Sequence, residues 1–569
     1  MAATDTAYGK TFTPPRPGAW EIDLTHFPRP STRFVGDVFI ANFGRGFAEG
    51  TKQYGLLLDR MDYVELHGFL YGTPRPVGAP ESAKGPPPKP IFKLLTWLHP
   101  EVRGRIRTAA EVVAKRAWLE DLAYWDNQVK PQAIREHLAI QNVDPRKLDD
   151  QGLAAHLQAA YTNATNGVYR HGRFTMTACL PVGDFLAHAK EWTGLPLHTL
   201  LRAVKGYSAV SNGVAGGHYE KLIKALRSDP ASAALLDRGA PLEALAALRA
   251  APGEVGAAAN AWLDEVSYRI VTGYDLCDHY ALELPDKLVD GLRSDLKAPN
   301  VRETQAAVEQ DVAKLRDKVP DTKRALFDEL LSDARAVYRV RDERDHYNDG
   351  WSTGLMRRAV LELGRRLADA GKLPSPELVI DASFEEMRAL LAGKGGPSAE
   401  ELKARAEWRA TADSTKVPQQ LGFAPSPPPP ADWLPPPAAR LARAIDVFLF
   451  GLFQPSEEAS SGETVRGIPV NAGVYEGPAR VVLGSEDFAS VKQGDVLVAR
   501  STSPYFNVLL PLLGAIVTER GGALSHAAIV AREYGIPGVV GTKTALSVIK
   551  NGQRIRVDGG AGEVRILGA

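Results

Sequence analysis

Hydrophobic residues recur at three- and four-residue spacing through residues 101–415, and this spacing predicts a region built almost entirely of helices. Segments 110–125 and 303–319 show the pattern clearly, because charged side chains separate their apolar positions. Alanine and leucine are abundant in this region, whereas glycine and proline mostly mark the ends of the periodic stretches. We therefore expect a helical domain over residues 101–415.

The segments on either side of this region have other patterns. Apolar runs at 34–43 and 62–72 predict strands between proline-rich loops, so residues 1–100 are interpreted as a mixed N-terminal part of the helical domain. Prolines concentrated in APSPPPPADWLPPP favour an extended spacer. Residues 416–465 are therefore predicted to form a linker, with a short apolar helix (LARAIDVFLFGLF) and a hinge (QPSEEASSGET).

Residues 466–569 carry short valine- and isoleucine-rich runs, each bounded by glycine, aspartate or asparagine. The runs GIPV, ARVVLG, GDVLVAR, GAIVTE, GVVG and RIRVDG predict strands with a few short helices between them. The expected fold class is thus multidomain, with a mainly α-helical domain followed by a C-terminal mixed α/β domain.

Composition narrows the possible functions. The 569 residues exceed what one hydrophobic core supports, and Lys+Arg and Asp+Glu are equal at 68 each. This balance argues against a nucleic-acid or membrane-surface partner. The start lacks an apolar leader, and the longest apolar run is broken by Pro511. Two cysteines, Cys179 and Cys277, are interpreted as core residues, and a cytoplasmic protein is expected.

One stretch, TERGGALSHAAIVAREYGIPG at 518–538, predicts a buried strand, a glycine turn and a short helix that begins at a histidine. Ser525 is a good N-cap, His526 takes the first helical position, and Gly535 with Pro537 ends the helix. The free N–H groups and positive dipole end at this position favour a phosphate. A neutral histidine nitrogen is also a competent nucleophile near neutral pH. The alternative is an ordinary N-terminal helix residue.

The run Thr518–Gly541 closely resembles the phosphohistidine motif of the swivelling domain in the phosphoenolpyruvate-utilising enzyme family. The flanks RGIPVNAGVYEGPARVV, GDVLVARSTSP and IRVDGGAGEVRIL extend the resemblance over essentially all of 466–569, with NAG at 471–473 in place of Ser-Pro-Gly. The resemblance implies that His526 is phosphorylated during turnover. It implies a phosphate-supporting role for five further residues: Thr518, Gly521, Gly522, Ser525 and Arg532.

The rest of the chain resembles only some members of this family. Segments 20–34 and 361–387 are similar, more weakly, to the helical acceptor domain of rifampicin phosphotransferase. We expect neither an ATP-grasp domain, nor a Walker A loop, nor a pyruvate-binding barrel, and AGKGGPSAEE (392–401) is interpreted as a turn followed by a Ser398–Glu401 capping box. The chain as a whole resembles the phosphohistidine subunit of phenylphosphate synthase and of cresol-phosphorylating enzymes, and also the C-terminal two domains of rifampicin phosphotransferase. The resemblance to the two-subunit enzymes bears on how the histidine is loaded. It implies that ATP and Mg²⁺ are held by a separate ATP-grasp subunit.

The acceptor implied by this resemblance is a small hydroxylated compound, expected to be aromatic, bound in the helical domain. Such an acceptor needs a base near its oxygen and a cation for the phosphoryl group. Candidate residues are the bases His67 and His279, the cations Arg269 and Arg344, and His346. For each of them, and most of all for the charge run 341–345, the alternative is a satisfied hydrogen-bond network or a solvated helix face. No ligand spacing indicates a tightly held metal.

Two other functions also agree with the sequence. The chain is alternatively a non-catalytic phosphocarrier or regulatory module whose helical part binds a protein, or a subunit that phosphorylates a large antibiotic. An aromatic-lined site would favour an enzyme, whereas a solid helical core with an apolar surface patch would favour a carrier.

Overall fold

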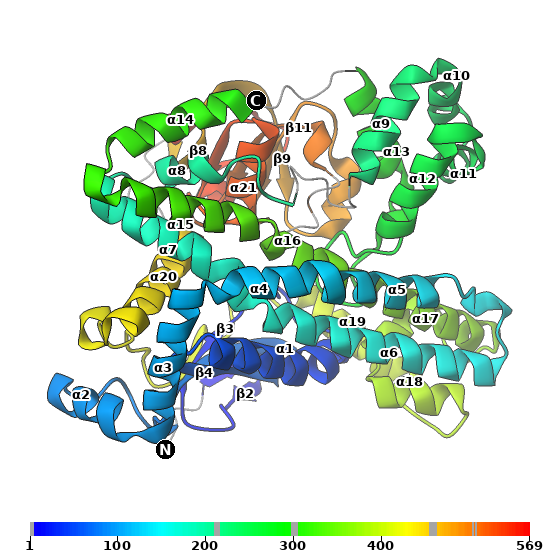
Figure 1. Cartoon of the computed structure of the whole chain (residues 1–569). Coiled ribbons are helices and arrows are strands. Elements are labelled where there is room, and N and C mark those ends of the chain that lie inside the picture. The colour runs from blue at the N-terminus through cyan, green and yellow to red at the C-terminus, as the bar shows by residue number, and fades with distance from the viewer. Residues whose placement is uncertain are drawn as a thin grey trace. The chain divides into compact units, whose positions relative to one another are not determined.

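The computed structural model describes residues 5–24, 26–209, 217–297, 305–453, 464–502, 506 and 509–568 (Figure 1). They fall into two compact units: residues 1–177, 274–278 and 347–442 form the first, and residues 178–273, 279–346 and 443–569 form the second. The units interleave along the chain, whereas the domains expected from the sequence are consecutive. That sequence-based division stays a prediction.

The first unit combines helices with a four-stranded antiparallel sheet of strand order β4-β5-β3-β6. The strands of this sheet are β3 (Ala19–Ile22), β4 (Leu58–Leu66), β5 (Phe69–Pro76) and β6 (Gln420–Gly422), and β1 (Asp5–Ala7) pairs with β2 (Lys10–Phe12) in a separate two-stranded sheet. Its helices are α1 (Arg33–Gln53), α2 (Lys89–Leu98), α3 (Pro100–Lys115), α4 (Ala117–Tyr124), the π-helix η1 (Trp125–Val129), α5 (Lys130–Gln141), α6 (Asp150–Arg173), α17 (Gly350–Asp369), α18 (Phe384–Leu391) and α19 (Ala399–Thr411), with short 3₁₀ turns η2 (Pro145–Lys147), η8 (Pro376–Asp381) and η9 (Ala431–Trp433).

Two strand predictions for this unit have opposite outcomes. The run at 62–72 forms β4 and β5, so that prediction is confirmed. The run at 34–43 lies in α1, and the strand predicted there is wrong. Phe34, Val35 and Val38 recur at helical spacing and are buried, so packing of this face selects the helix despite the glycines of the segment.

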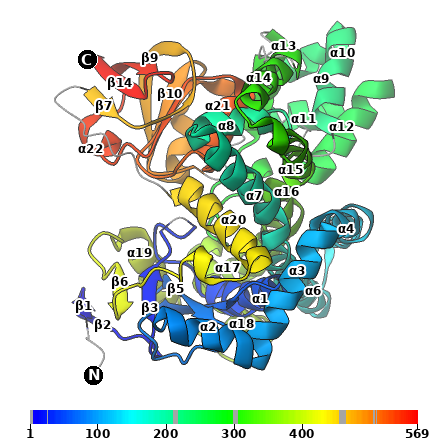
Figure 2. The ribbon, with the colours of Figure 1, turned by 60° about the vertical axis from the view of Figure 1, so that its left-hand side comes forward.

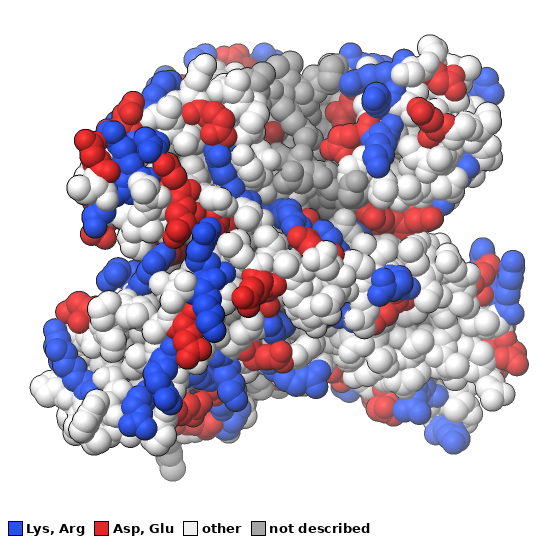
Figure 3. All heavy atoms as spheres, viewed as in Figure 1, with Lys and Arg blue, Asp and Glu red and all other residues white. Residues whose placement is uncertain are grey.

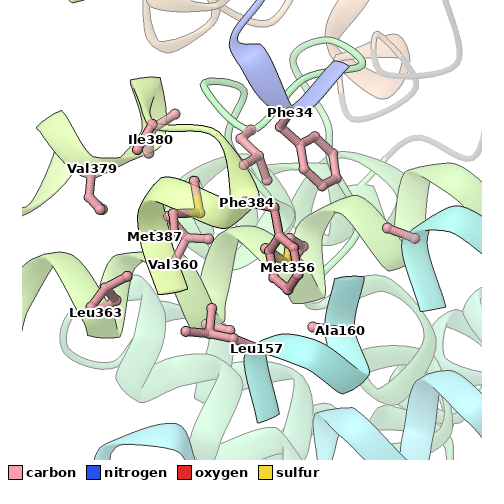
Figure 4. Close-up of a cluster of buried hydrophobic side chains, with 14 of the residues drawn as sticks. Phe34, Leu157, Ala160, Met356, Val360, Leu363, Val379, Ile380, Phe384 and Met387 are labelled. Atoms are coloured by element: carbon pink, nitrogen blue, oxygen red, sulfur yellow. The ribbon is translucent and has the colours of Figure 1, made fainter. Parts of the chain in front are cut away.

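The core of the first unit lies where α1, α6, α17, η8 and α18 meet (Figure 4). Met356 and Val360 of α17 are fully buried there, and Phe384 of α18 is 4% exposed. Phe384 also stacks on half-buried Tyr161, with ring centroids 3.8 Å apart. These apolar contacts between segments distant in sequence hold the unit together.

The second unit joins helices to the C-terminal sheet. The helices α7 (Thr175–Thr193) and α20 (Pro436–Phe453) and the π-helix η7 (Asp345–Asp349) each have residues in both units. The other helices of the second unit are α8 (Leu197–Leu200), α9 (His218–Ser228), α10 (Pro230–Ala233), α11 (Pro241–Ala250), α12 (Gly253–Val266), α13 (Pro285–Lys297), α14 (Gln305–Asp317), α15 (Arg324–Val337), α16 (Val340–Arg344), α21 (His526–Tyr534) and α22 (Ala545–Val548). Its 3₁₀ turns are η3 (Leu201–Val204), η4 (Ala234–Asp237), η5 (Ala281–Glu283), η6 (Asp321–Lys323), η10 (Ser485–Ser490) and η12 (Leu510–Leu512). Its strands are β7 (Thr464–Arg466), β8 (Ile468–Asn471), β9 (Val474–Val482), β10 (Asp495–Ala499), β11 (Leu513–Thr518), β12 (Gly538–Val540), β13 (Arg554–Asp558) and β14 (Glu563–Gly568).

The eight strands form one mixed sheet in the order β7-β14-β13-β9-β10-β11-β12-β8, with β9 to β12 parallel. Both faces of its centre are buried. Val496 and Val498 of β10 join one apolar cluster, whereas Leu497 and Ala499 join the other, as alternation along a strand requires. The predicted C-terminal mixed sheet is confirmed, and within each predicted run the structure has a strand.

The predicted apolar helix of the linker is confirmed by α20, which begins earlier because proline is tolerated in the first helical turn. The predicted hinge falls largely in residues 454–463, outside the described residues. The Ser398–Glu401 capping box at α19 is confirmed. Among the helices that the structure describes, none has the length and apolarity of a membrane span. Basic and acidic side chains are interspersed over the face drawn in Figure 3.

Candidate functional site

His526 occupies the first position of α21, at the end of the loop that follows β11. Ser525 is the N-cap, and its hydroxyl accepts from the N–H of Ala528 at 3.4 Å. Gly535 ends the helix in the left-handed conformation with φ of 69°. The predicted bounds of this helix are therefore confirmed, and the imidazole lies at the positive end of its dipole.

The loop before the helix depends on its glycine pair. Gly521 has φ of 103°, and a Cβ there would lie 2.7 Å from the Cβ of Ser525. The N–H of Gly522 donates to the carbonyl of Leu452, at the end of α20, at 2.8 Å. The hydroxyl of buried Thr518 donates to the carbonyl of Arg520 at 2.9 Å. These contacts fix the approach of the backbone to the histidine.

The His526 side chain is only 4% exposed, and its Nδ1 lies 3.0 Å from the hydroxyl of Thr502. Burial, followed by the nearby charge of Arg341, lowers the pKa of His526 from 6.5 to about 3. The imidazole is therefore neutral at physiological pH. When the Thr502 hydroxyl accepts from Nδ1–H, the ring's lone pair is on Nε2, which makes Nε2 the nucleophilic atom.

Arg341 of α16 lies close to this histidine. Its Nη1 donates to the carbonyl of Leu524, two residues before His526, in a short hydrogen bond. The acidic residues of the same run, Asp342, Glu343 and Asp345, are buried, so a solvated face does not apply to them and the hydrogen-bond network is the alternative that remains. Packing against the rest of the unit, rather than local polarity, decides their exposure.

Arg532 and Glu533 tie α21 to its surroundings. Arg532 is 2% exposed, and its Nη1 donates to the carbonyl of Ala523 at 2.9 Å. Glu533 accepts from the N–H of Gly206 at 3.0 Å. Helix α8 lies beside α21 (Figures 1 and 2), and the charge of Arg532 contributes, after burial, to a lowered pKa of His198 in α8. Arg532 thus braces the loop before the histidine, and its predicted phosphate-supporting role stays a prediction, as do those of Thr518, Gly521, Gly522 and Ser525.

The acceptor-site candidates are dispersed. His67, in the first unit, forms the β4–β5 turn with φ of 56°, and its Nε2 lies 2.8 Å from the carbonyl oxygen of Thr11. In the second unit, Arg269 is 4% exposed, with its Nη2 3.9 Å from a carboxylate oxygen of Glu265. The N–H of His279 donates to the hydroxyl of Thr272 at 2.7 Å.

The two other candidates lie near Arg341. The Nε of Arg344 donates to the carbonyl of Arg341 at 3.3 Å, and His346 is half-buried in η7. The acceptor roles of the five candidates stay predictions. Reasoning from the sequence missed Thr502 and Arg341 as neighbours of His526. Thr502 stands in the GDVLVARSTSP flank, whereas Arg341 offers no local signal because it reaches His526 only through packing.

The similarity of this chain to known proteins lies mainly in the C-terminal residues that surround His526. Residues 491–562 match the family model of the mobile domain of PEP-utilising enzymes. Rifampicin phosphotransferase of Bacillus cereus is 48% identical over 105 residues, which cover 18% of this chain and 12% of that protein. Phosphoenolpyruvate synthase of Aeropyrum pernix is 47% identical over 113 residues, covering 19% and 14%.

A longer similarity joins the chain to chondramide synthase of Chondromyces crocatus, which is 32% identical over 249 residues, covering 42% of this chain and 6% of that protein. This length exceeds the C-terminal domain, so part of the similarity lies in the rest of the chain. The chain spans between 6% and 14% of the length of these three relatives.

Proposed function

Through its C-terminal domain this chain belongs to the phosphoenolpyruvate-utilising enzyme family, and from this premise we propose that it is a phosphotransferase that carries a phosphoryl group on His526. ATP held with Mg²⁺ by a separate ATP-grasp subunit loads the histidine, with water consumed and AMP and inorganic phosphate released. The phosphoryl group then passes to the hydroxyl of a small acceptor, a phenol or cresol.

The observation that carries this proposal is the environment of His526. Its pKa of about 3 keeps the imidazole neutral, and the hydroxyl of Thr502 lies 3.0 Å from Nδ1. Together they favour Nε2 as the attacking atom. The start of α21 moves with His526 and provides a positive potential for the phosphoryl group.

Burial of His526 supports a carrier that moves. At 4% exposure the imidazole is out of reach of a second protein, so loading requires the C-terminal domain to leave this pose. The contacts that must open include Arg341 with Leu524, and Lys287, whose Nζ donates to the carbonyls of Ala489 and Val491 at 3.1 Å each. Apolar contacts must open as well, because Leu284 packs against the apolar cluster of the C-terminal domain.

A second candidate is phosphorylation of a large antibiotic. The 48% identity to a rifampicin phosphotransferase favours it, although that similarity lies within 105 residues. Acceptor size separates the two candidates, because a phenol and rifampicin differ greatly in the area they need to contact.

The test supplies the chain with an ATP-grasp subunit and ATP labelled in both the β- and the γ-phosphoryl groups, and then adds phenol, p-cresol or rifampicin. We expect label on His526 that phenol or p-cresol discharges, no label in His526→Ala, and normal label in the matched control His188→Gln. Discharge to rifampicin alone would favour the antibiotic enzyme. Label that none of the three discharges would favour a phosphocarrier, and turnover by His526→Ala would contradict the proposal.

A further inference from the structure

A row of aromatic side chains lies along one face of α1 in the first unit. Phe39, Phe43 and Phe47 are four residues apart, and successive ring centroids are 4.9 and 6.0 Å apart. Tyr63 of β4 meets Phe39 and Phe43 edge to face at 5.4 and 5.8 Å. Phe39, Phe43 and Tyr63 are half-buried, so the described residues do not cover this row completely.

A histidine–aspartate pair stands beside this row. The ring of His171, on α6, has its centroid 5.9 Å from that of Phe43. Its Nδ1 lies 2.8 Å from Oδ1 of Asp349, and the two side chains are 15% and 13% exposed. A carboxylate in this position sets the tautomer of the imidazole and stabilises the imidazolium that forms when the ring takes a proton.

Glycines bring these groups together. A Cβ on Gly46 of α1 would lie 2.1 Å from the carbonyl oxygen of Tyr169, and one on Gly172 of α6 would lie 2.5 Å from that of Phe43. A Cβ on Gly167 would lie 3.0 Å from the carbonyl carbon of Asn348. The α6 backbone therefore touches both α1 and the residues next to Asp349. Asp349 itself ends η7, a rare π-helical turn of a kind frequent at functional sites.

We propose that this row and the His171–Asp349 pair form the acceptor site: an aryl ring packs on Phe39, Phe43 and Tyr63, and His171 takes the proton of its hydroxyl. The inference rests on the proposed phosphotransfer. The acceptor oxygen bonds to phosphorus as the Nε2–P bond of phosphorylated His526 breaks. The bonding pair returns to Nε2, Nδ1 of His526 keeps its proton, and the acceptor's proton goes to the ring nitrogen of His171 that Asp349 does not hold, then to solvent.

Binding is tested first, without any phosphoryl donor. Phenol and p-cresol are titrated into the full chain by calorimetry, with cyclohexanol as the non-aromatic comparison. We expect Phe43→Ala to weaken phenol binding by about tenfold, with Phe43→Leu intermediate. The control Phe92→Ala, which removes a ring 5.7 Å from Trp433, should bind phenol like the unaltered chain. Equal binding by all variants, or no binding by the unaltered chain, would overturn the site.

The base is tested by discharge of phosphorylated His526 to phenol. We expect His171→Gln to bind phenol normally but to discharge about a hundredfold more slowly, and to lose the dependence of the rate on pH that a titrating base gives. The control His188→Gln removes a histidine whose Nδ1 lies 3.1 Å from Asp184 and should discharge normally. An unchanged rate of discharge in His171→Gln would refute the role of His171 as the base. A failure to label His526 would instead refute the proposed function, while phenol titration still decides the site.

Discussion

Acidification should release the C-terminal domain from the helices of the second unit, because His526 is buried in a form that resists protonation. Burial and then Arg341 lower its pKa from 6.5 to about 3. On undocking, the side chain regains its ordinary pKa, so the undocked state binds the extra proton. The docked state is therefore fully stable above pH 6.5, weakens as the pH falls below 6.5, and continues to weaken until about pH 3.

The size of the effect follows from these two values. At about pH 5 an undocked imidazole is almost fully protonated, and docking then costs about 2 kcal/mol, or about thirtyfold in the docking equilibrium. Mass spectrometry of deuterium exchange at imidazole Cε1 reports both the pKa and the exposure of a histidine. We expect His526 to exchange slowly at neutral pH, with a midpoint well below 6.5.

Variants separate the two causes of the shift. Arg341→Met should raise the pKa of His526 only part of the way, because burial is the larger cause and remains. Arg339→Met is the matched control, since this neighbouring arginine pairs with Glu343 at 2.7 Å. A midpoint near 6.5 in the unaltered chain would refute the reasoning, as would exchange that does not change with Arg341.

Three further substitutions test the surroundings of the histidine. Thr502→Val removes the hydroxyl that orients Nδ1 and should slow labelling of His526 about tenfold in a quenched-flow assay, whereas an unchanged rate would exclude this role. Gly521→Ala forces a side chain onto a backbone with φ of 103° and should destabilise the chain by about 1–3 kcal/mol in thermal unfolding; a neutral effect would contradict the strain. Lys287→Met removes the donor to the carbonyls of exposed Ala489 and buried Val491 and should cost about 1–3 kcal/mol in denaturant unfolding, with protection of residues 489–491 from amide exchange as the second measure; full protection would contradict it.

The first and last residues of helix α21, which carries His526, could be predicted from residues within the same segment. The N-cap Ser525 and the left-handed Gly535 determine where α21 begins and ends, and both act within the segment itself. Strand alternation in β10 likewise follows from apolar burial on two faces. Such features need only neighbouring residues, so the sequence is sufficient to predict them.

Features that depend on packing between distant segments were missed or mistaken. The glycines of 34–50 lower helix propensity, yet Gly46 and Gly50 are where α1 packs on the backbone of α6, and that contact outweighs the local preference. Arg341 and the His171–Asp349 pair are likewise products of tertiary contact. Nothing in the residues beside Arg341 reveals that it meets the loop before His526.

Phosphoryl transfer through His526 is decided by finding the residue that carries phosphate. The chain is incubated with an ATP-grasp subunit and ATP, digested under alkaline conditions that preserve phosphohistidine, and mapped by mass spectrometry. We expect one acid-labile phosphate, on His526, which disappears when phenol is added. Phosphate on any other residue, or phenyl phosphate formed by His526→Ala, would contradict it.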